Sequence, residues 1–324
     1  MKQLTLVTTA ALAFWSPLSA TDLSLGKVVQ CNLGSDCYIQ QYVDHDVTSL
    51  ASDYRCNGLS YDGHKGTDFA LISRRQMEAG VNVMAAASGR VIGVRDGMND
   101  VLYQAQDSSA VAGKECGNGV VVEHHQGWTT QYCHLKRNSV TVKRGDTVDQ
   151  GDVLGQIGLS GKTQFPHLHL TVRKNQKVVD PFRPKGRTSC SAVQPDKTLW
   201  EINLPYRPEG LLRIGFSEDV PNYQKLKDGA IAGDDVSALS HALVLYGFGY
   251  GFRQGDRLYF RIDGPQGKVF EHHTEVKKAQ IQAMRAAGLK RKGASWPKGL
   301  YKGEVILLRK GKIIEQRTRQ VTLN

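Results

Sequence analysis

The sequence has no long apolar run beyond its first residues. The run from Leu4 to Trp15 is too short to anchor a protein in a membrane, and no later segment reaches the roughly 20 apolar residues of a spanning helix. Lys2 precedes this run and Ser19-Ala20 follows it, which is typical of a secretion signal covering residues 1–20. The nearest cysteine, Cys31, is too distant for a lipoprotein anchor. We therefore expect no transmembrane segment and a periplasmic or secreted protein.

The sequence also lacks Cys-x-x-Cys pairs, which argues against a zinc site made of cysteines. Its six cysteines agree with export, because an oxidising compartment allows them to pair. Cys31 could close a small loop with Cys37, and Cys116 could reach Cys133 across a hairpin, but the sequence does not choose among the pairings. All six lie before residue 191, namely Cys31, Cys37, Cys56, Cys116, Cys133 and Cys190.

Acidic residues are the minority among the charges, with 31 against 42 Lys and Arg and a net charge of +11. Loss of the signal would remove one lysine and no acid, which leaves +10. Such a charge steers an exported protein toward anionic partners such as cell-wall polymers or acidic lipid. No helix-turn-helix, zinc-finger or aromatic RNA-binding signature accompanies the charge, so we expect no nucleic-acid partner.

Long helical periodicity is absent between residues 68 and 170. Short β-runs broken by Gly, Asp and Asn occur there instead, which predicts an antiparallel β domain. Residues 120–123 and 128–132 flank a turn and should form a hairpin, and Val140-Thr141-Val142 should form a further strand. The segment from Met98 to Lys114 is polar, and we expect a long loop that could form a cleft wall.

Shifts in composition divide the chain. A linker rich in Pro and Gly separates two β-rich parts, and the second part has the strand spacing of a small β-sandwich. Within that sandwich, Val276 to Ala287 has helical spacing and predicts a short inserted helix. The expected division is signal peptide 1–20, N-terminal wrapping segment 21–54, a first β domain 55–185, linker 186–197 and C-terminal β-sandwich 198–324.

Two short motifs, about a hundred residues apart, carry side chains that can bind a metal. His167 and His169 lie two apart in a strand-like run and therefore point to the same face. His64 and Asp68 lie four apart, a spacing that also returns to one face. Two imidazoles and one carboxylate make a three-ligand zinc site with a fourth position for water. We predict that His64, Asp68 and His169 hold one zinc ion.

These motifs and their neighbours resemble the LytM/lysostaphin-type peptidases of family M23 over residues 55–180. The resemblance implies an antiparallel β domain of the lipoyl/hybrid-motif type, with zinc in a groove. It also implies cleavage of peptide bonds in bacterial peptidoglycan, in stem–stem cross-links or in glycine-rich bridges. The residues that carry it are His64-Lys65-Gly66-Thr67-Asp68, Gly117-Asn118-Gly119-Val120, His124, Tyr132-Cys133-His134-Leu135, Val142 to Gly151, Gly158 to Thr163 and Pro166 to His169.

The resemblance implies the same three zinc ligands and makes His134 and His167 the catalytic pair beside the metal-bound water. No His-Glu-x-x-His is present, so histidines must fill the role of the glutamate base of other zinc proteases. Phe165 stands where the family often has Gly, and we expect it to narrow or line the groove. We interpret His124 and His125 as structural.

The expected function is that of a monomeric zinc metalloendopeptidase, in which a zinc-bound water attacks an amide carbonyl of a peptidoglycan peptide. The alternative is a non-catalytic relative that binds the wall or activates another cell-wall hydrolase. In the C-terminal part, His272-His273 has no third ligand nearby in sequence. The basic residues there form either a solvated face or a site for wall or phosphate groups, and they include Lys277, Lys278, Lys290, Arg291, Lys292, Arg317 and Arg319.

Overall fold

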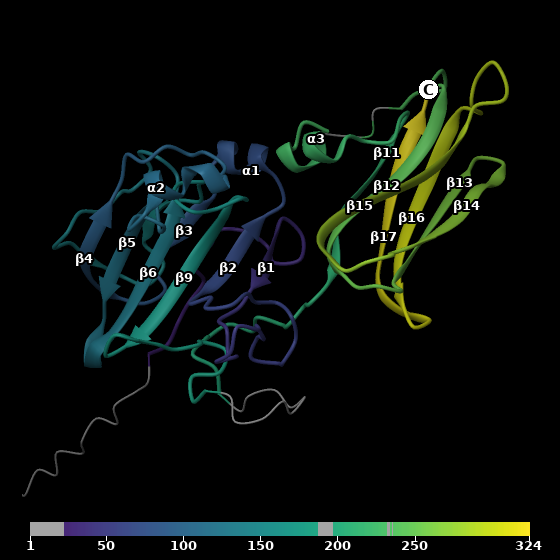
Figure 1. Cartoon of the computed structure of the whole chain (residues 1–324). Helices are drawn as coiled ribbons and strands as arrows, with labels where there is room; N and C mark the ends of the chain where they lie inside the picture. The colour runs from purple at the N-terminus through teal and green to yellow at the C-terminus, as the bar shows by residue number, and fades with distance from the viewer. Residues whose placement is uncertain (1–22, 187–196, 232–233, 235) are drawn as a thin grey trace, which may run out of the picture.

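The chain folds into two β-rich regions built from antiparallel sheets (Figure 1). The expected all-β class is therefore confirmed. The described helices are all short, and none of them is long and apolar enough to cross a membrane. The expected signal peptide, most of the expected linker and Cys190 lie outside the described part. The structure is a computed structural model, and it describes residues 23–186, 197–231, 234 and 236–324.

The first region contains a sheet of eight strands. Seven follow the order β1-β2-β9-β6-β5-β4-β7, and β10 pairs with β9. A separate two-stranded sheet pairs β3 (Asn82–Met84) with β8 (Val153–Gln156). The strands of the large sheet are β1 (Cys37–Gln41), β2 (Thr67–Leu71), β4 (Gly89–Arg95), β5 (Asn118–Glu123), β6 (Trp128–Leu135), β7 (Thr147–Val148), β9 (His167–Lys174) and β10 (Lys177–Val178).

The predicted hairpin forms the middle of this sheet. In β5, Val120 and Val122 are fully buried, and such burial stabilises the fold by about 1.5–3 kcal/mol per side chain. The short 3₁₀ turn η2 (His125–Gly127) joins β5 to β6, and Gly127 takes a positive φ there. The strand expected at residues 140–142 does not form. Thr141 makes a single backbone hydrogen bond there, to the Leu154 carbonyl, and one bond is not enough to pair two strands.

The helices are short connectors at the ends of strands. Helix α1 (Arg74–Ala79) begins after Ser73, whose hydroxyl accepts a hydrogen bond from the Gln76 amide, and it ends at Gly80 in a positive φ. Both caps are visible in the sequence, although the helix was not predicted. The others are η1 (Ala105–Asp107), α2 (Ser108–Val111) and α3 (Tyr223–Asp228).

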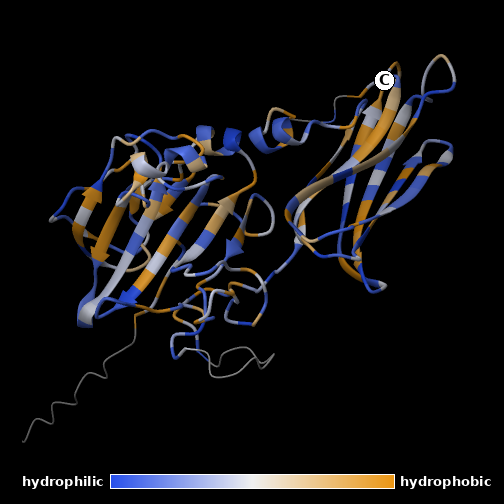
Figure 2. Cartoon of the chain, viewed as in Figure 1, coloured by the Kyte–Doolittle hydropathy of each residue, from blue (hydrophilic) through white to orange (hydrophobic). Residues whose placement is uncertain are grey.

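The second region packs two antiparallel sheets around one core, as expected for a β-sandwich. The core is lined by apolar side chains from both sheets, and Figure 2 shows these strands alternating between apolar and polar residues. One sheet holds β11 (Gly210–Ser217), β12 (Ala242–Phe252) and β15 (Gln280–Lys290). The other holds β14 (Gly267–Glu275), β13 (Arg257–Gly264), β16 (Gly299–Arg309) and β17 (Lys312–Leu323).

The prediction of an inserted helix between Val276 and Ala287 is wrong. Most of this segment lies in β15, which pairs with β12 from Ala242 to Phe252. Without β15, this side of β12 would leave its backbone N–H and C=O groups unpaired at the edge of the sheet. The helical spacing has no corresponding apolar face, because Ile281 is 63% exposed while Ala283 is buried. Tertiary pairing therefore overrides the local pattern.

The two regions contact each other where β1 and the residues just before it meet the sheet β11-β12-β15 and Arg317 of β17. The ring of Tyr38 lies 4.4 Å from the ring of Tyr250, measured between centroids. The Gln282 side-chain amide donates to the Tyr38 hydroxyl at 2.5 Å. Arg317 donates to the backbone carbonyl of Gly34 at 2.5 Å. Arg317, one of the basic residues noted in the sequence, therefore serves in this contact.

Two disulfides that the sequence suggested are present. Cys31 is bonded to Cys37, and Cys116 to Cys133, with Cα separations of 6.1 and 4.8 Å. The second bond ties the start of β5 to β6. It also lies directly before His134 in the chain, so it restrains the backbone that carries this histidine.

Replacing Cys116 and Cys133 together by serine should lower the free energy of unfolding by about 3 kcal/mol, because the bond closes a loop with a sequence separation of 17. The same change at Cys31 and Cys37, whose separation is 6, should cost only about 2 kcal/mol. Denaturant unfolding of both variants measures the difference. A larger loss at the shorter loop would contradict the loop-entropy explanation.

Candidate metal centre

The pairing register of β2 and β9 brings two of the predicted ligands together. Asp68 is the direct partner of His169 in this antiparallel pair. Side chains of directly opposite residues project to the same face of the sheet. The carboxylate and the imidazole therefore meet, with 2.8 Å between Asp68 Oδ1 and His169 Nδ1.

The third predicted ligand, His64, lies in the loop before β2. Its Nδ1 is 2.7 Å from the backbone carbonyl oxygen of Tyr42. Because a carbonyl can only accept a hydrogen bond, Nδ1 carries the proton and the lone pair is on Nε2. This Nε2 lies 3.2 Å from Asp68 Oδ1 and 3.1 Å from His169 Nδ1.

These three donor atoms have the spacing of a metal site. Each lies within 4.8 Å of the other two, and the pairwise distances run from 2.8 to 3.2 Å. Bond lengths near 2.0–2.1 Å place the ligand atoms of a tetrahedral zinc site about 3.3 Å apart, so the donor set fits this metal. A second cluster in the described part, at Cys31, Asp36 and Cys37, has both sulfurs in a disulfide and therefore offers no thiolates.

Gly66, between His64 and Asp68, is needed there for steric reasons. A Cβ at Gly66 would lie 2.6 Å from His169 Nε2 and 2.7 Å from the Leu170 carbonyl oxygen. Both distances are below normal contact, so a side chain there would push the His169 ring away. His169 Nε2 is also 3.1 Å from the hydroxyl of Thr171, a contact that helps to orient the ring.

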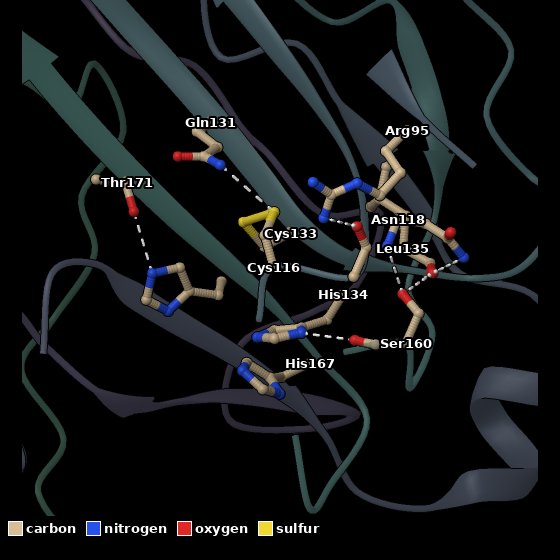
Figure 3. The surroundings of a disulfide bond; sticks show 12 residues. Arg95, Cys116, Asn118, Gln131, Cys133, His134, Leu135, Ser160, His167 and Thr171 are labelled. Atoms are coloured by element: carbon tan, nitrogen blue, oxygen red, sulfur yellow. Dashed lines mark hydrogen bonds between the residues drawn. A yellow bond between two sulfur atoms is a disulfide. The ribbon is translucent and has the colours of Figure 1, made fainter. Parts of the chain in front are cut away.

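His134 and His167 lie side by side (Figure 3), with ring centroids 4.7 Å apart. His134 donates from Nδ1 to the Ser160 carbonyl at 2.8 Å. His167 donates from Nδ1 to the Phe165 carbonyl at 2.9 Å. Both rings therefore keep an unprotonated Nε2, and that of His167 lies 3.6 Å from Asp68 Oδ1.

Burial dominates the acid–base properties of this pair. It lowers the pKa of His134 well below its usual value, and the charges of His167 and His169 lower it further. Burial also lowers the pKa of His167. Burial acts to raise the pKa of Asp68, but the imidazoles of His64 and His167 and hydrogen bonds from His169 and His64 hold it well below its usual range. The pair is therefore neutral and the carboxylate ionised at neutral pH.

The backbone at His134 is strained and braced. Its φ is +62°, a region that costs a residue with a side chain about 1–3 kcal/mol and occurs mainly at functional sites. Its amide donates to the Cys116 carbonyl at 2.8 Å. The neighbouring Leu135 carbonyl accepts bonds from the Ser160 hydroxyl and the Asn118 side-chain amide (Figure 3). The supporting roles of Ser160 and Asn118 were not predicted, although both lie inside motifs that the sequence analysis singled out.

A cavity of about 770 Å³ opens beside these side chains. Phe165 lines it and stacks on His167 with centroids 4.3 Å apart, as expected for a residue that narrows the groove. Tyr103, from the long loop that begins at Met98, lines it too, so this loop contributes a wall. The Asn118 side chain holds the start of the loop through two hydrogen bonds of 2.8 Å to the Met98 backbone.

The remaining histidines of interest lie elsewhere. His124 is buried, and its ring nitrogens are within hydrogen-bond distance of the Ser88 carbonyl and the Thr130 hydroxyl, at 2.8 and 2.9 Å. These contacts agree with its interpretation as structural. His272 and His273 are exposed on β14, and within the described part no third metal-ligating group joins them.

Replacing His64 by alanine should abolish stoichiometric zinc binding, because two donors remain where three converge. Gly66→Ala should weaken zinc binding at least about tenfold by displacing the His169 ring. Metal analysis and a competitive chelator titration measure both effects. His272→Ala is the matched control and should keep full zinc content. Unchanged zinc affinity in both His64→Ala and Gly66→Ala would exclude this donor set.

Comparison with known proteins agrees with this geometry. Residues 62–181 match Peptidase family M23. Cell division protein DipM of Caulobacter vibrioides is 31% identical over 118 residues, covering 36% of this chain and 18% of that protein. Peptidoglycan DD-endopeptidase ShyB of Vibrio cholerae is 30% identical over 120 residues, covering 37% of this chain and 22% of that protein.

The catalytic domain of lysostaphin from Staphylococcus simulans, a solved structure, is 23% identical and covers 44% of this chain and 85% of that one, with a TM-score of 0.27. The chain spans only about a fifth of the length of the two curated relatives named above. The matched stretch nevertheless contains all five histidine and aspartate positions of the centre. Residues 62–181 are therefore a peptidase family M23 domain.

Proposed function

We propose that this chain is an extracytoplasmic zinc endopeptidase that hydrolyses peptide cross-links of bacterial peptidoglycan. In this proposal His64, Asp68 and His169 are the ligands of one zinc ion, and His134 and His167 are the catalytic histidines. The single observation that carries it is the convergence of three donor atoms beside two neutral imidazoles at the edge of an open cavity.

The chemistry follows from the protonation of the donors. A zinc ion at this position supplies a Lewis acid that makes water a nucleophile near neutral pH and polarises an amide carbonyl. In this proposal the unprotonated Nε2 atoms of His134 and His167 accept the proton of the attacking water, and that of His167 lies 3.6 Å from Asp68 Oδ1. After accepting it, the same imidazole can donate it to the leaving amine nitrogen. The carbonyls of Ser160 and Phe165 keep both rings in the required tautomer.

The substrate class is supported by the relatives and by the disulfides. One of the relatives, ShyB, is a peptidoglycan DD-endopeptidase. Disulfides are typical of proteins outside the cytoplasm, where peptidoglycan is accessible. The chain's formal charge of +11 also favours an anionic polymer as partner.

The alternative is a wall-binding protein or an activator of another hydrolase, without catalysis. The relative DipM is described as a cell division protein, which leaves this class open for the family. Against the alternative stand the complete donor set and the two flanking imidazoles, since binding to the wall would require neither. The two functions differ in whether the purified chain alone releases peptide fragments.

Purified protein should solubilise peptidoglycan sacculi, and chelation should abolish this activity while added zinc restores it. His64→Ala should show no clearing, because the metal is lost. Loss of turbidity and mass spectrometry of the released fragments provide the measurements. Clearing by His64→Ala at the wild-type rate would contradict a zinc-dependent mechanism.

His134→Ala should separate catalysis from metal binding. It should lower kcat about 10²–10⁴-fold, the usual contribution of a positioned acid–base group, while zinc content stays at the wild-type level. His124→Ala is an imprecise control because His124 is buried, so the exposed His272→Ala should be used, and its kcat should remain unchanged. Wild-type kcat in His134→Ala would remove this histidine from the mechanism.

A further inference from the structure

The cavity beside the metal centre has walls from both β regions. Asp68 and His167 line it from the M23 domain. Tyr223 and Lys227 of α3 and residues 280–282 of β15 line it from the C-terminal region. The family match ends at residue 181, so this second wall lies outside it. The volume of about 770 Å³ is within the range of ligand-binding pockets.

The second wall is tied to the strands that carry the metal centre. Gln282 Nε2 donates to the Tyr38 hydroxyl at 2.5 Å, and the Tyr223 hydroxyl donates to the Gln282 carbonyl at 3.3 Å. Tyr38 lies on β1, which pairs with the Asp68 strand β2. A small apolar cluster that includes Tyr38, Ala70 and Phe248 buries the rest of this contact. The C-terminal wall is therefore positioned by packing against the sheet of the site.

The charges on the cavity wall are unbalanced. Two lysines line it, Lys162 from the M23 domain and Lys227 from α3. Their ammonium groups lie 5.8 and 5.7 Å from the ring centres of Tyr103 and Tyr223. Among the described lining residues, Asp68 alone carries a carboxylate, and a bound metal ion would more than neutralise it. Backbone hydrogen bonds and, to a smaller extent, the charge of Lys162 lower the pKa of the exposed Glu115, but within the described part no carboxylate lies within ion-pair distance of either lysine. The cavity therefore favours an anionic ligand.

We propose that Lys162 and Lys227 form a carboxylate-binding subsite, with the C-terminal region supplying half of it. The ligand is a free carboxylate on the substrate peptide, next to the amide that is cut. An ammonium group offers three donors, and its hydrogen bonds to a carboxylate are charge-assisted. The inference rests on the proposed function, because it concerns the substrate of the same site.

A second cavity continues this groove along the contact between the regions. It has a volume of about 470 Å³ and shares with the first cavity Gln40, Gln41, Gln280 and Ile281. A cross-linked peptide has two arms, and these two adjacent cavities offer a place for each. In this proposal the arm with the free carboxylate binds in the first cavity, which contains Lys162 and Lys227.

The test uses the full-length zinc-loaded chain with two probes, a cross-linked muropeptide dimer and the same dimer with its carboxylates converted to carboxamides. Lys227→Met and Lys162→Met should each raise KM for the natural dimer about tenfold and leave kcat within about twofold. Neither change should affect KM for the amidated dimer. Lys227→Arg should have a KM close to that of the wild type, because arginine keeps the positive charge.

Lys225→Met is the matched control, since Lys225 is an exposed lysine of the same helix that does not line the cavity. Its KM should equal that of the wild type for both probes. Equal KM values for natural and amidated dimers in the wild type, or a tenfold loss in Lys225→Met, would overturn the subsite.

Binding of an uncross-linked stem tetrapeptide, used as a probe, separates this inference from the proposed function. Calorimetric titration should show that the wild type prefers the carboxylate form about tenfold over the amidated form, and that Lys227→Met loses this preference. If this preference is found but no dimer is cleaved, the subsite stands and the proposed activity fails. If the dimer is cleaved but the tetrapeptide forms bind equally or not at all, the activity stands and the subsite fails.

Discussion

The site depends on one structural constraint, the register between β2 and β9. This register places Asp68 directly opposite His169, so a carboxylate and an imidazole meet at 2.8 Å. A slip by one residue would turn one of the two side chains to the other face of the sheet and separate the donors. The buried Leu168 and Leu170 oppose such a slip, because it would move them out of the core.

Main-chain carbonyls also fix the geometry of the site, by orienting its histidines. The backbone carbonyls of Tyr42, Ser160 and Phe165 each accept a hydrogen bond from the Nδ1–H of a different histidine. These bonds fix the tautomers of His64, His134 and His167. A carbonyl of the backbone cannot change its role with pH, which makes it a dependable partner for this purpose. The geometry of the centre is thus set by hydrogen bonds to the backbone as much as by the candidate ligands themselves.

The C-terminal region gives this chain a groove that the M23 domain does not form by itself. Helix α3 and strand β15 add Lys227 and Gln282 to the wall of the cavity, and Tyr38 joins this wall to β1. A groove with walls from two packed regions can contact more residues of a peptide than a groove in one sheet. The region thus forms part of the cavity wall beside the candidate metal centre and is not a separate appendage.

The sequence by itself determined most of the short β-runs and the hairpin, because side-chain alternation is a local property, and it predicted His64, Asp68 and His169 as a ligand set. It could not determine that residues 280–290 form a strand, since only the unpaired edge of β12 decides this. Nor could it show the carbonyls that orient the histidines or the lysine that α3 brings to the cavity. Folding of the first region brings the Tyr42 and Ser160 carbonyls to His64 and His134, and packing of the two regions brings Lys227 to the cavity.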